Sequence, residues 1–202
     1  MNALILVDLQ NDFLPGGALP VPHGDEVIPL ANELQQRFDL VVATKDWHPP
    51  DHGSFAANHP GKEPGDRIIL DGIEQILWPA HCVQNTHGAE FHKDLIDDPR
   101  ITIISKGIDE SADGYSGFDG TNLTQILRKQ GVEEVWVGGL ATDYCVKHTV
   151  LDGLREGFAV KALADAMLPV NVNPHDGEQA IAEMRAAGAE IVGNASKAAG
   201  VA

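Results

Sequence analysis

Short apolar runs rich in β-branched residues recur along this chain of 202 residues, and helical patterns separate several of them. The runs are continuous rather than alternating in polarity, which is typical of strands that are covered on both faces of a parallel sheet. They lie at residues 3–7, 40–43, 101–104, 132–137, 159–162 and 190–192. Strands that alternate with helices predict a three-layer α/β/α sandwich with a mainly parallel, Rossmann-like central sheet.

Apolar residues at helical spacing predict helices between these runs. They lie at residues 25–38, 122–130, 143–156 and 173–188. For the helix at 143–156, we expect Thr142 or Asp143 to be the N-cap. For the last helix, we expect Asn173 to cap its start, Pro174 to lie in its first turn and Gly188 to end it.

The long stretch at 47–99 interrupts this alternation, because it is rich in Gly, Pro, His and Asp. A loop of that length is uncommon inside a compact domain and is often functional. The sequence shows no internal repeat, no low-complexity tract and no domain boundary. We therefore predict a single domain over 1–202, with a loop-rich insertion around 47–99 that carries metal and substrate contacts.

Composition excludes several classes of partner and compartment. A net charge of −16 disfavours nucleic acid and anionic membranes as partners. Two cysteines are too few for a disulfide scaffold, and the start has no basic region or cleavage site of a signal peptide. No apolar run approaches the ~18 residues of a membrane span. We expect a cytoplasmic protein with free thiols and a small-molecule substrate, and the sequence leaves homo-oligomers open.

Polar residues follow four of the predicted strands at their carboxyl ends. Asp8 follows the first, Asp46 and His48 the second, and Lys106 the third, while the fourth leads through two glycines to Cys145. Ligands of open parallel sheets bind beyond these ends, so we expect the side chains to meet at one edge of the sheet.

Each of these residues also has an ordinary interpretation. Cys145 can be a small core residue, Asp8 a local hydrogen-bonding group at a strand end, and Lys106 a surface lysine with a buried stem. In the first turn of a helix, however, free N–H groups and the helix dipole favour a thiolate and can bind an oxyanion. A thiol with an acid and a lysine nearby indicates nucleophilic catalysis.

Histidines and a carboxylate predict a metal site. Asp46 and His48 are two apart in an extended segment, so their side chains share one face. His52 and His81 follow in the same loop-rich stretch, and such ligands suit zinc, iron or manganese. The other histidines (His23, His59, His87, His92, His148 and His175) and Cys82 are interpreted as structural or solvent-facing. No glycine-rich phosphate loop follows a strand, which excludes a dinucleotide enzyme.

Five segments together resemble a known family. They are LILVDLQNDFLPGGAL, TKDWHPPDHGSFAANH, WPAHCVQNTHGAEFH, SKG followed by DGYSGF, and GLATDYCVKHTVLDG. In this order, over nearly the whole chain, they are similar to the isochorismatase-like cysteine hydrolases, and within these to the bacterial nicotinamidases. The resemblance implies the isochorismatase-like hydrolase fold predicted above.

The resemblance also assigns roles to residues. It implies a catalytic triad of Asp8, Lys106 and Cys145. It implies one divalent metal ion on Asp46, His48 and His81, with zinc preferred and iron or manganese as alternatives. His52 matches a position that ligates the metal only in some members. An oxyanion hole from the N–H groups of Ala141 and Cys145, after a cis peptide at Leu140–Ala141, and an aromatic pocket of Phe13, Trp78 and Tyr115 complete the implied site.

The activity that this implies is hydrolysis of nicotinamide to nicotinate and ammonia through a cysteine thioester, a step of pyridine nucleotide salvage, with pyrazinamide as a further substrate. Two alternatives stay open. One is a related cysteine amidohydrolase for a carbamoyl or ureido compound, which would not need the metal set. The other is a non-catalytic metal- or ligand-binding relative, which would be expected to lack Asp8, Lys106 or Cys145.

Overall fold

A computed structural model describes residues 1–70, 72–95 and 98–195. Its centre is a six-stranded sheet in the order β5-β2-β1-β6-β7-β8, and every neighbouring pair in it is parallel. The strands are β1 (Asn2–Val7), β2 (Leu40–Asp46), β5 (Thr102–Lys106), β6 (Glu134–Leu140), β7 (Ala159–Leu168) and β8 (Glu190–Val192). All six predicted strands are confirmed, and β2, β5, β6 and β7 extend further toward their carboxyl ends than the apolar runs.

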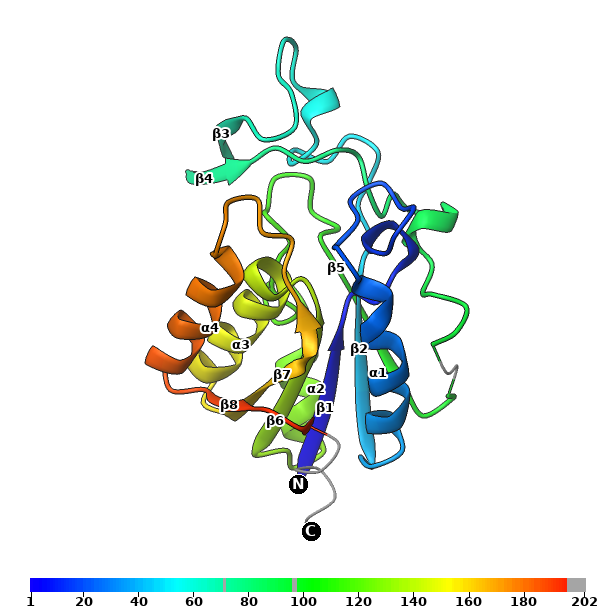
Figure 1. The fold of residues 1–202 in the computed structure, drawn as a ribbon, viewed down its shortest axis with the longest axis vertical. Coiled ribbons are helices and arrows are strands. Elements are labelled where there is room, and N and C mark those ends of the chain that lie inside the picture. Colours follow the sequence, from blue (N-terminus) through cyan, green and yellow to red (C-terminus); the bar gives the residue numbers. More distant parts are fainter. Residues whose placement is uncertain (71, 96–97, 196–202) are drawn as a thin grey trace.

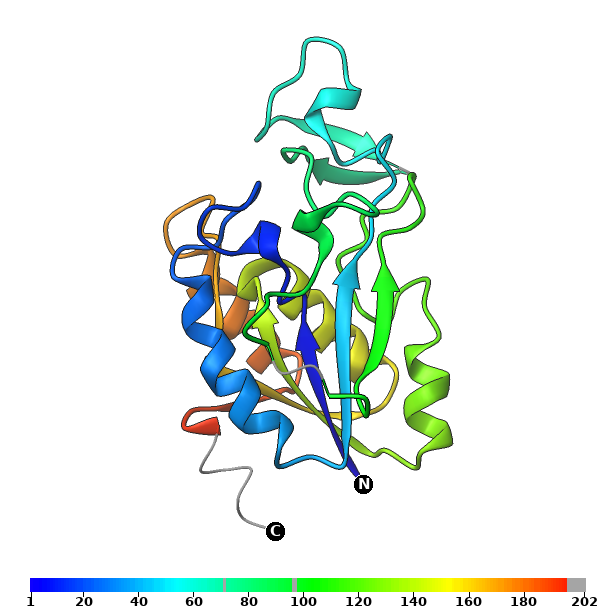
Figure 2. The same ribbon diagram turned by 90° about the vertical axis from the view of Figure 1, so that its right-hand side faces the viewer.

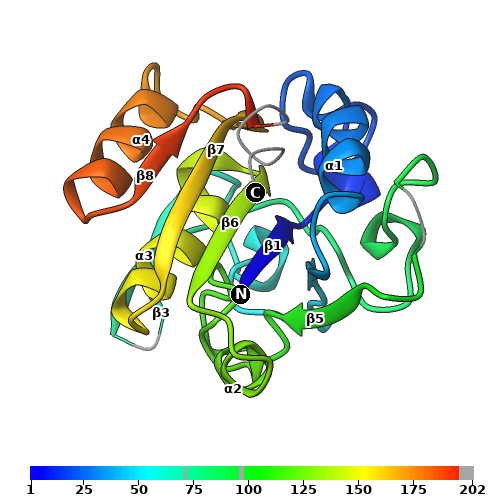
Figure 3. The same ribbon diagram turned by 90° about the horizontal axis from the view of Figure 1, so that it is seen from below.

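Helices cover both faces of this sheet, as Figure 3 shows from below. Helix α1 (Val27–Gln35) packs on one face, where Ile28 and Leu34 meet Leu4 and Leu6 of β1. The other face carries α2 (Leu123–Lys129), α3 (Lys147–Arg155) and α4 (Asp176–Ala186). Helices on both faces bury most of the apolar side chains of the strands, and the predicted α/β/α sandwich is confirmed.

The start of α4 differs from the prediction. Asn173 and Pro174 precede the helix, which begins at Asp176 after His175 in a left-handed conformation. The Asp176 carboxylate accepts a hydrogen bond from the backbone N–H of Asn173 at 2.8 Å, which closes a turn before the helix. The capping role predicted for Asn173 is therefore wrong, whereas Gly188 does follow the helix end, as predicted.

The segment before α3 also differs from the prediction. A short π-helix, Thr142–Val146, precedes α3, and Ala141 is its N-cap. Asp143 accepts hydrogen bonds from the N–H groups of Val170 and Asn171 in a distant loop, so it does not cap the helix. The buried hydroxyl of Thr142 has no partner among the described residues. Neither of the two predicted caps is used.

Part of the stretch at 47–99 is more regular than the sequence suggested. Strands β3 (Arg67–Leu70) and β4 (Ile73–Ile76) pair antiparallel in a small second sheet. Figures 1 and 2 show this hairpin beyond the carboxyl ends of the central strands, where the polar residues are expected to meet. In the described parts of the chain, no helix has the length and apolar character needed to cross a membrane.

Candidate active site

Asp8, Lys106 and Cys145 come together at the carboxyl edge of the sheet. All three are buried, and they follow or end β1, β5 and β6 in turn. The Lys106 Nζ lies 2.8 Å from Oδ2 of Asp8 and 3.4 Å from Sγ of Cys145. It also donates to Oδ1 of Asp46 at 2.6 Å and to the carbonyl of Gly114 at 2.9 Å. The buried ammonium is thus balanced by two carboxylates.

The two oxygens of Asp8 have different surroundings. Oδ1 accepts a 2.6 Å hydrogen bond from the hydroxyl of Thr44. Oδ2 is ion-paired with Lys106 but accepts no directed hydrogen bond from the described residues. A carboxylate oxygen of Asp8 and Sγ of Cys145 lie within 4.8 Å of each other. Oδ1 of Asp8 is therefore fixed by a hydrogen bond, and Oδ2 is free to accept a proton.

Burial dominates the proton affinities in this group. Desolvation raises the pKa of Asp8 to about 6, although the charge of Lys106 opposes the shift. Desolvation also raises the pKa of the Cys145 thiol well above its usual range, again against Lys106. The expectation that the helix start favours a thiolate is not met, because burial outweighs it. A base must remove the thiol proton, and the pKa of Asp8 suits it for that role near neutral pH.

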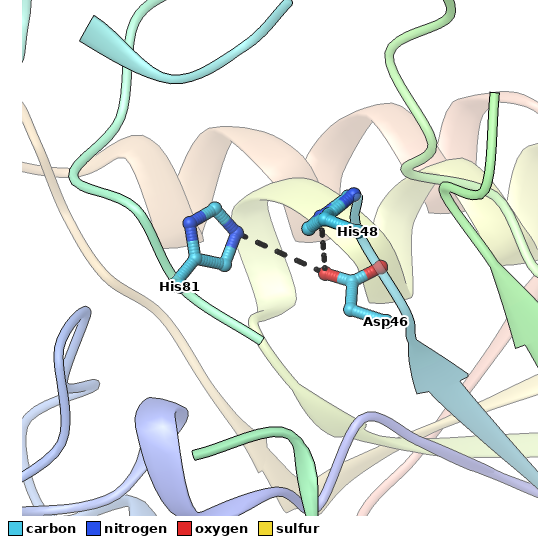
Figure 4. A group of neighbouring side chains, drawn as sticks. All are labelled: Asp46, His48 and His81. Atoms are coloured by element: carbon cyan, nitrogen blue, oxygen red, sulfur yellow. Dashed lines mark ion pairs between the residues drawn. The ribbon is translucent and has the colours of Figure 1, made fainter. Parts of the chain in front are cut away.

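Asp46, His48 and His81 form a second group beside the first (Figure 4), and each is buried. Oδ2 of Asp46 lies 3.4 Å from Nε2 of His48 and 4.0 Å from Nε2 of His81. One ligand atom of each residue lies within 4.8 Å of the others. Ligand atoms at about 2.1 Å from a tetrahedral metal are about 3.4 Å apart, so the group is close to that geometry.

Hydrogen bonds orient both histidines for metal binding. Nδ1 of His48 lies 2.8 Å from the carbonyl of Gly107, and Nδ1 of His81 lies 2.8 Å from that of Pro79. A carbonyl only accepts, so the proton belongs on Nδ1 and the lone pair of each Nε2 faces Asp46. Burial lowers the pKa of His81 to about 4, which keeps its ring neutral at pH 7. The residues present therefore fit a divalent cation.

His52 lies outside this group of three. Its ring packs 4.1 Å from that of His48, and its Nδ1 accepts a hydrogen bond from the backbone N–H of Ser54. Since Nδ1 is an acceptor, the proton lies on Nε2, which has no partner among the described residues. In this tautomer Nε2 offers no lone pair to a metal.

A narrow pocket opens next to Cys145 and the group of Asp46, His48 and His81. The sequence indicated the aromatic residues Phe13, Trp78 and Tyr115 for it, and all three line it together with Ala141. Sequence reasoning missed five further lining residues: Leu19, Ser54, Asp113, Tyr144 and Val170. Only Tyr144 lay beside a residue already singled out, so little in the sequence pointed to the others.

Polar contacts fix the aromatic wall of this pocket. The hydroxyl of Tyr115 accepts hydrogen bonds from Nε1 of Trp78 at 2.9 Å and from the side chain of Gln75 at 2.8 Å. The ring of Tyr144 meets that of Trp78 edge-on at 4.8 Å, and the ring of His148 stacks on Tyr115 at 5.1 Å. Rings held in this way present fixed apolar planes to a flat ligand.

The turn between β6 and the π-helix lies at the pocket, which Ala141 and Cys145 line. The peptide Leu140–Ala141 is cis, as the resemblance implied. Within the described residues, no backbone acceptor takes the N–H of Ala141. Gly139 has a φ of +122°, and a Cβ there would lie 2.1 Å from the carbonyl oxygen of Val7. Gly139, just before this turn, thus allows the backbone to pass close to β1. This packing role explains the glycine without a phosphate-binding loop.

The remaining predictions on histidine and cysteine also have structural outcomes. His23, His87 and His175 are exposed, and each lies near a glutamate three residues later. Nε2 of His59 donates to the carbonyl of Gly53 at 2.7 Å, within the insertion. Both cysteines are buried and free, as predicted. His148 and His92 are partly buried, so a solvent-facing position holds for only some of this set.

The fold and this site together define an α/β protein of the doubly wound type, with an Asp–Lys–Cys group and a cluster of Asp46, His48 and His81 at the carboxyl edge of its sheet. Comparison with known proteins agrees, because the model of the isochorismatase domain matches residues 2–196. The chain belongs to the isochorismatase family.

Relatives with known names are similar over almost the whole chain. A nicotinamidase of Escherichia coli is 47% identical over 94% of this chain and 93% of its own length. A solved nicotinamidase/pyrazinamidase of Acinetobacter baumannii has a TM-score of 0.92 at 44% identity, over 98% of this chain and 97% of that chain. A pyrazinamidase of Pyrococcus horikoshii, solved in complex with zinc, has a TM-score of 0.81 at 46% identity, over 95% and 98%.

Proposed function

We propose that this chain is a nicotinamidase, which hydrolyses nicotinamide to nicotinate and ammonia and also accepts pyrazinamide. One observation carries the proposal: a buried thiol, a carboxylate with a pKa of about 6 and a lysine converge beside a narrow pocket lined by aromatic side chains. The names of similar proteins support the choice of substrate. A soluble cytoplasmic location is part of the same proposal.

In the proposed reaction, Cys145 is the nucleophile and Asp8 the general base. Asp8 takes the thiol proton as sulfur attacks the amide carbon, and the carbonyl π electrons move onto oxygen. When the tetrahedral intermediate collapses, the C–N bond breaks and Asp8 passes its proton to the departing nitrogen, which leaves as ammonia. Water then attacks the thioester, Asp8 takes the proton of that water, the C–S bond breaks, and the proton returns to sulfur.

Charge stabilisation in this scheme comes from Lys106 and from two backbone groups. Lys106, within 3.4 Å of both Asp8 and Cys145, stabilises the ionised form of each. The N–H groups of Ala141 and Cys145 would bind the oxyanion that forms on the substrate oxygen. Fixed donors in a site without bulk water are worth several kcal/mol in such a step, roughly 3–4 for one donor.

Phe13, Trp78 and Tyr115 would hold the pyridine ring, with the carboxamide directed toward Cys145. We propose that Asp46, His48 and His81 hold a divalent metal ion, and zinc is the favoured identity, because two imidazoles and one carboxylate suit it and a similar pyrazinamidase was solved with zinc. When bound, the ion supplies a Lewis-acidic centre beside the pocket. His52 would support the ring of His48 rather than bind the ion.

The test is an assay of ammonia and nicotinate released from nicotinamide, with metal analysis of the same sample. The parent chain and Cys82→Ala should both produce the two products in equal amounts, whereas Cys145→Ala should produce neither. Cys82 is the matched control, because it is the other buried, free cysteine. Turnover of a ureido compound but not of nicotinamide would overturn the assignment in favour of another cysteine amidohydrolase.

A further inference from the structure

Gln10 lies two residues after Asp8 and is completely buried. Its side-chain amide binds both backbone groups of Asp46: Oε1 accepts the Asp46 N–H at 2.8 Å, and Nε2 donates to the Asp46 carbonyl at 2.8 Å. Nε2 also donates to the carbonyl of Ala89 at 2.9 Å. One side chain therefore joins the last residue of β2 to the loop that follows His81.

The backbone explains why a side chain makes these bonds. The pairing of β1 with β2 ends at Leu6–Ala43, and one further bond runs from the Asp8 N–H to the Thr44 carbonyl at 3.3 Å. The φ of 51° at Asp8 then turns the chain away. Asp46 stays paired with Lys106 of β5 on its other side. The amide of Gln10 has the same donor and acceptor as a peptide group, and it takes the place of the strand that has left.

A neighbour of Gln10, Asp12, holds the backbone next to His81, another residue of the proposed metal site. Oδ2 of Asp12 accepts the N–H of Cys82 at 2.7 Å, directly after His81. Asn11, between them, contacts points further along the same loop: its side chain donates to the carbonyl of His87 and its N–H to that of Glu90. The segment 10–12 thus contacts the backbone at or next to two of the three ligands.

We propose that Gln10 is a positioning residue for the metal site: it fixes the backbone of Asp46 so that one carboxylate oxygen meets Lys106 and the other meets the two histidines. The inference rests on the proposed metal site but not on the proposed substrate, because metal binding is measured without nicotinamide. Outer contacts that orient metal ligands change metal affinity by about 10- to 100-fold.

Two variants separate positioning from packing. Gln10→Met keeps the length of the side chain but loses all three hydrogen bonds. Gln10→Glu keeps the shape and the acceptor for the Asp46 N–H, but it turns a second oxygen toward two carbonyls, where at most one proton can be shared. The matched controls are Gln35→Met and Gln35→Glu, since Gln35 is equally buried but lies in α1, away from the site.

The experiment titrates full-length, metal-stripped protein with Co²⁺, follows the visible absorption of the bound ion, and repeats the titration with Zn²⁺ against a coloured chelator. Circular dichroism and thermal unfolding of each metal-free variant are measured first. We expect at least a tenfold weaker affinity and a changed Co²⁺ spectrum for the Gln10 variants. For the Gln35 variants, we expect affinity within twofold of the parent. If Gln10→Met does not fold, Gln10→Glu decides.

Two outcomes would overturn the proposal. If a folded Gln10 variant binds both ions within twofold of the parent and with the same Co²⁺ spectrum, Gln10 serves packing alone, whatever the change in unfolding temperature. If the parent chain binds neither ion, the metal site fails and the role of Gln10 fails with it. That second result would leave the amidase assay of Cys145→Ala unaffected, so the two failures can be told apart.

Discussion

Replacing Lys106 by Met should protonate Asp8 at neutral pH. The Lys106 ammonium has no solvent exposure, lies 2.8 Å from Oδ2 of Asp8 and donates to Asp46 at 2.6 Å. Methionine fills a similar volume but carries no charge. The variant therefore leaves two buried carboxylates near each other without a counter-ion, and protonation of Asp8 relieves that state at the least cost.

The size of the effect follows from the geometry. At 2.8 Å and an effective dielectric constant of about 20, the attraction between Lys106 and Asp8 is roughly 6 kcal/mol. Its loss would raise the pKa of Asp8 by up to about four units. Water that enters the altered site screens part of this difference. We expect the acid limb of kcat/KM, which burial of Asp8 places at about 6 in the parent, to rise by at least two units. With its pKa raised to about 8, only about a tenth of Asp8 would be ionised at pH 7.

The assay is release of ammonia from nicotinamide between pH 5 and 10, at low substrate, with the folded fraction measured by circular dichroism. Lys106→Met should lose at least tenfold at pH 7 and recover part of that loss as the pH rises. Lys45→Met is the control, because Lys45 precedes Asp46 on β2 but lies over the ring of Trp47, away from Asp8. An acid limb for Lys106→Met within half a unit of the parent would refute the reasoning.

Three further predictions concern the parent pH profile, the pocket and the metal. For the parent, kcat/KM should fall below about pH 6, since the raised pKa of Asp8 means that the base is lost as pH falls through that value; a flat profile down to pH 4.5 would exclude Asp8 as the base. Tyr115→Phe should destabilise the fold by about 1–3 kcal/mol in urea unfolding and raise KM, because Trp78 and Gln75 lose their shared acceptor; unchanged stability would show that both find other partners. Removing metal with a chelator should abolish activity and added Zn²⁺ should restore it, and full activity of metal-free protein would contradict a role for the ion.

The central sheet could be predicted because its strands carry continuous apolar runs, which the helices bury on both faces of the sheet. Parallel strands also place their carboxyl ends at one edge, which is why the sequence alone groups Asp8, Asp46, Lys106 and Cys145. The parallel topology of the sheet brings these residues, which are far apart in the sequence, within a few ångströms of each other.

Other features depend on contacts that no local pattern encodes. Thr44 contacts Asp8, which follows β1, and Gln10 contacts Asp46, the last residue of β2; both partners are 36 residues away. The raised pKa of Cys145 reflects its burial, which a helix start in the sequence does not reveal. The hairpin of β3 and β4 did have a local signal: Asp71-Gly72 stands between two short runs, a dipeptide typical of two-residue hairpin turns.

Gly107 gives the end of β5 a second function. Lys106 reaches Asp8 and Cys145, while the carbonyl of the next residue, Gly107, holds Nδ1 of His48. A Cβ on Gly107 would lie 2.3 Å from Cε1 of His48, so the histidine ring rests against bare backbone. β5 is an edge strand, and only its pairing with β2 sets its register. If β5 shifted by one residue along β2, the Lys106 side chain and the Gly107 carbonyl would both be displaced. A single-residue deletion in β5 should therefore disable nucleophile activation and metal binding in one event.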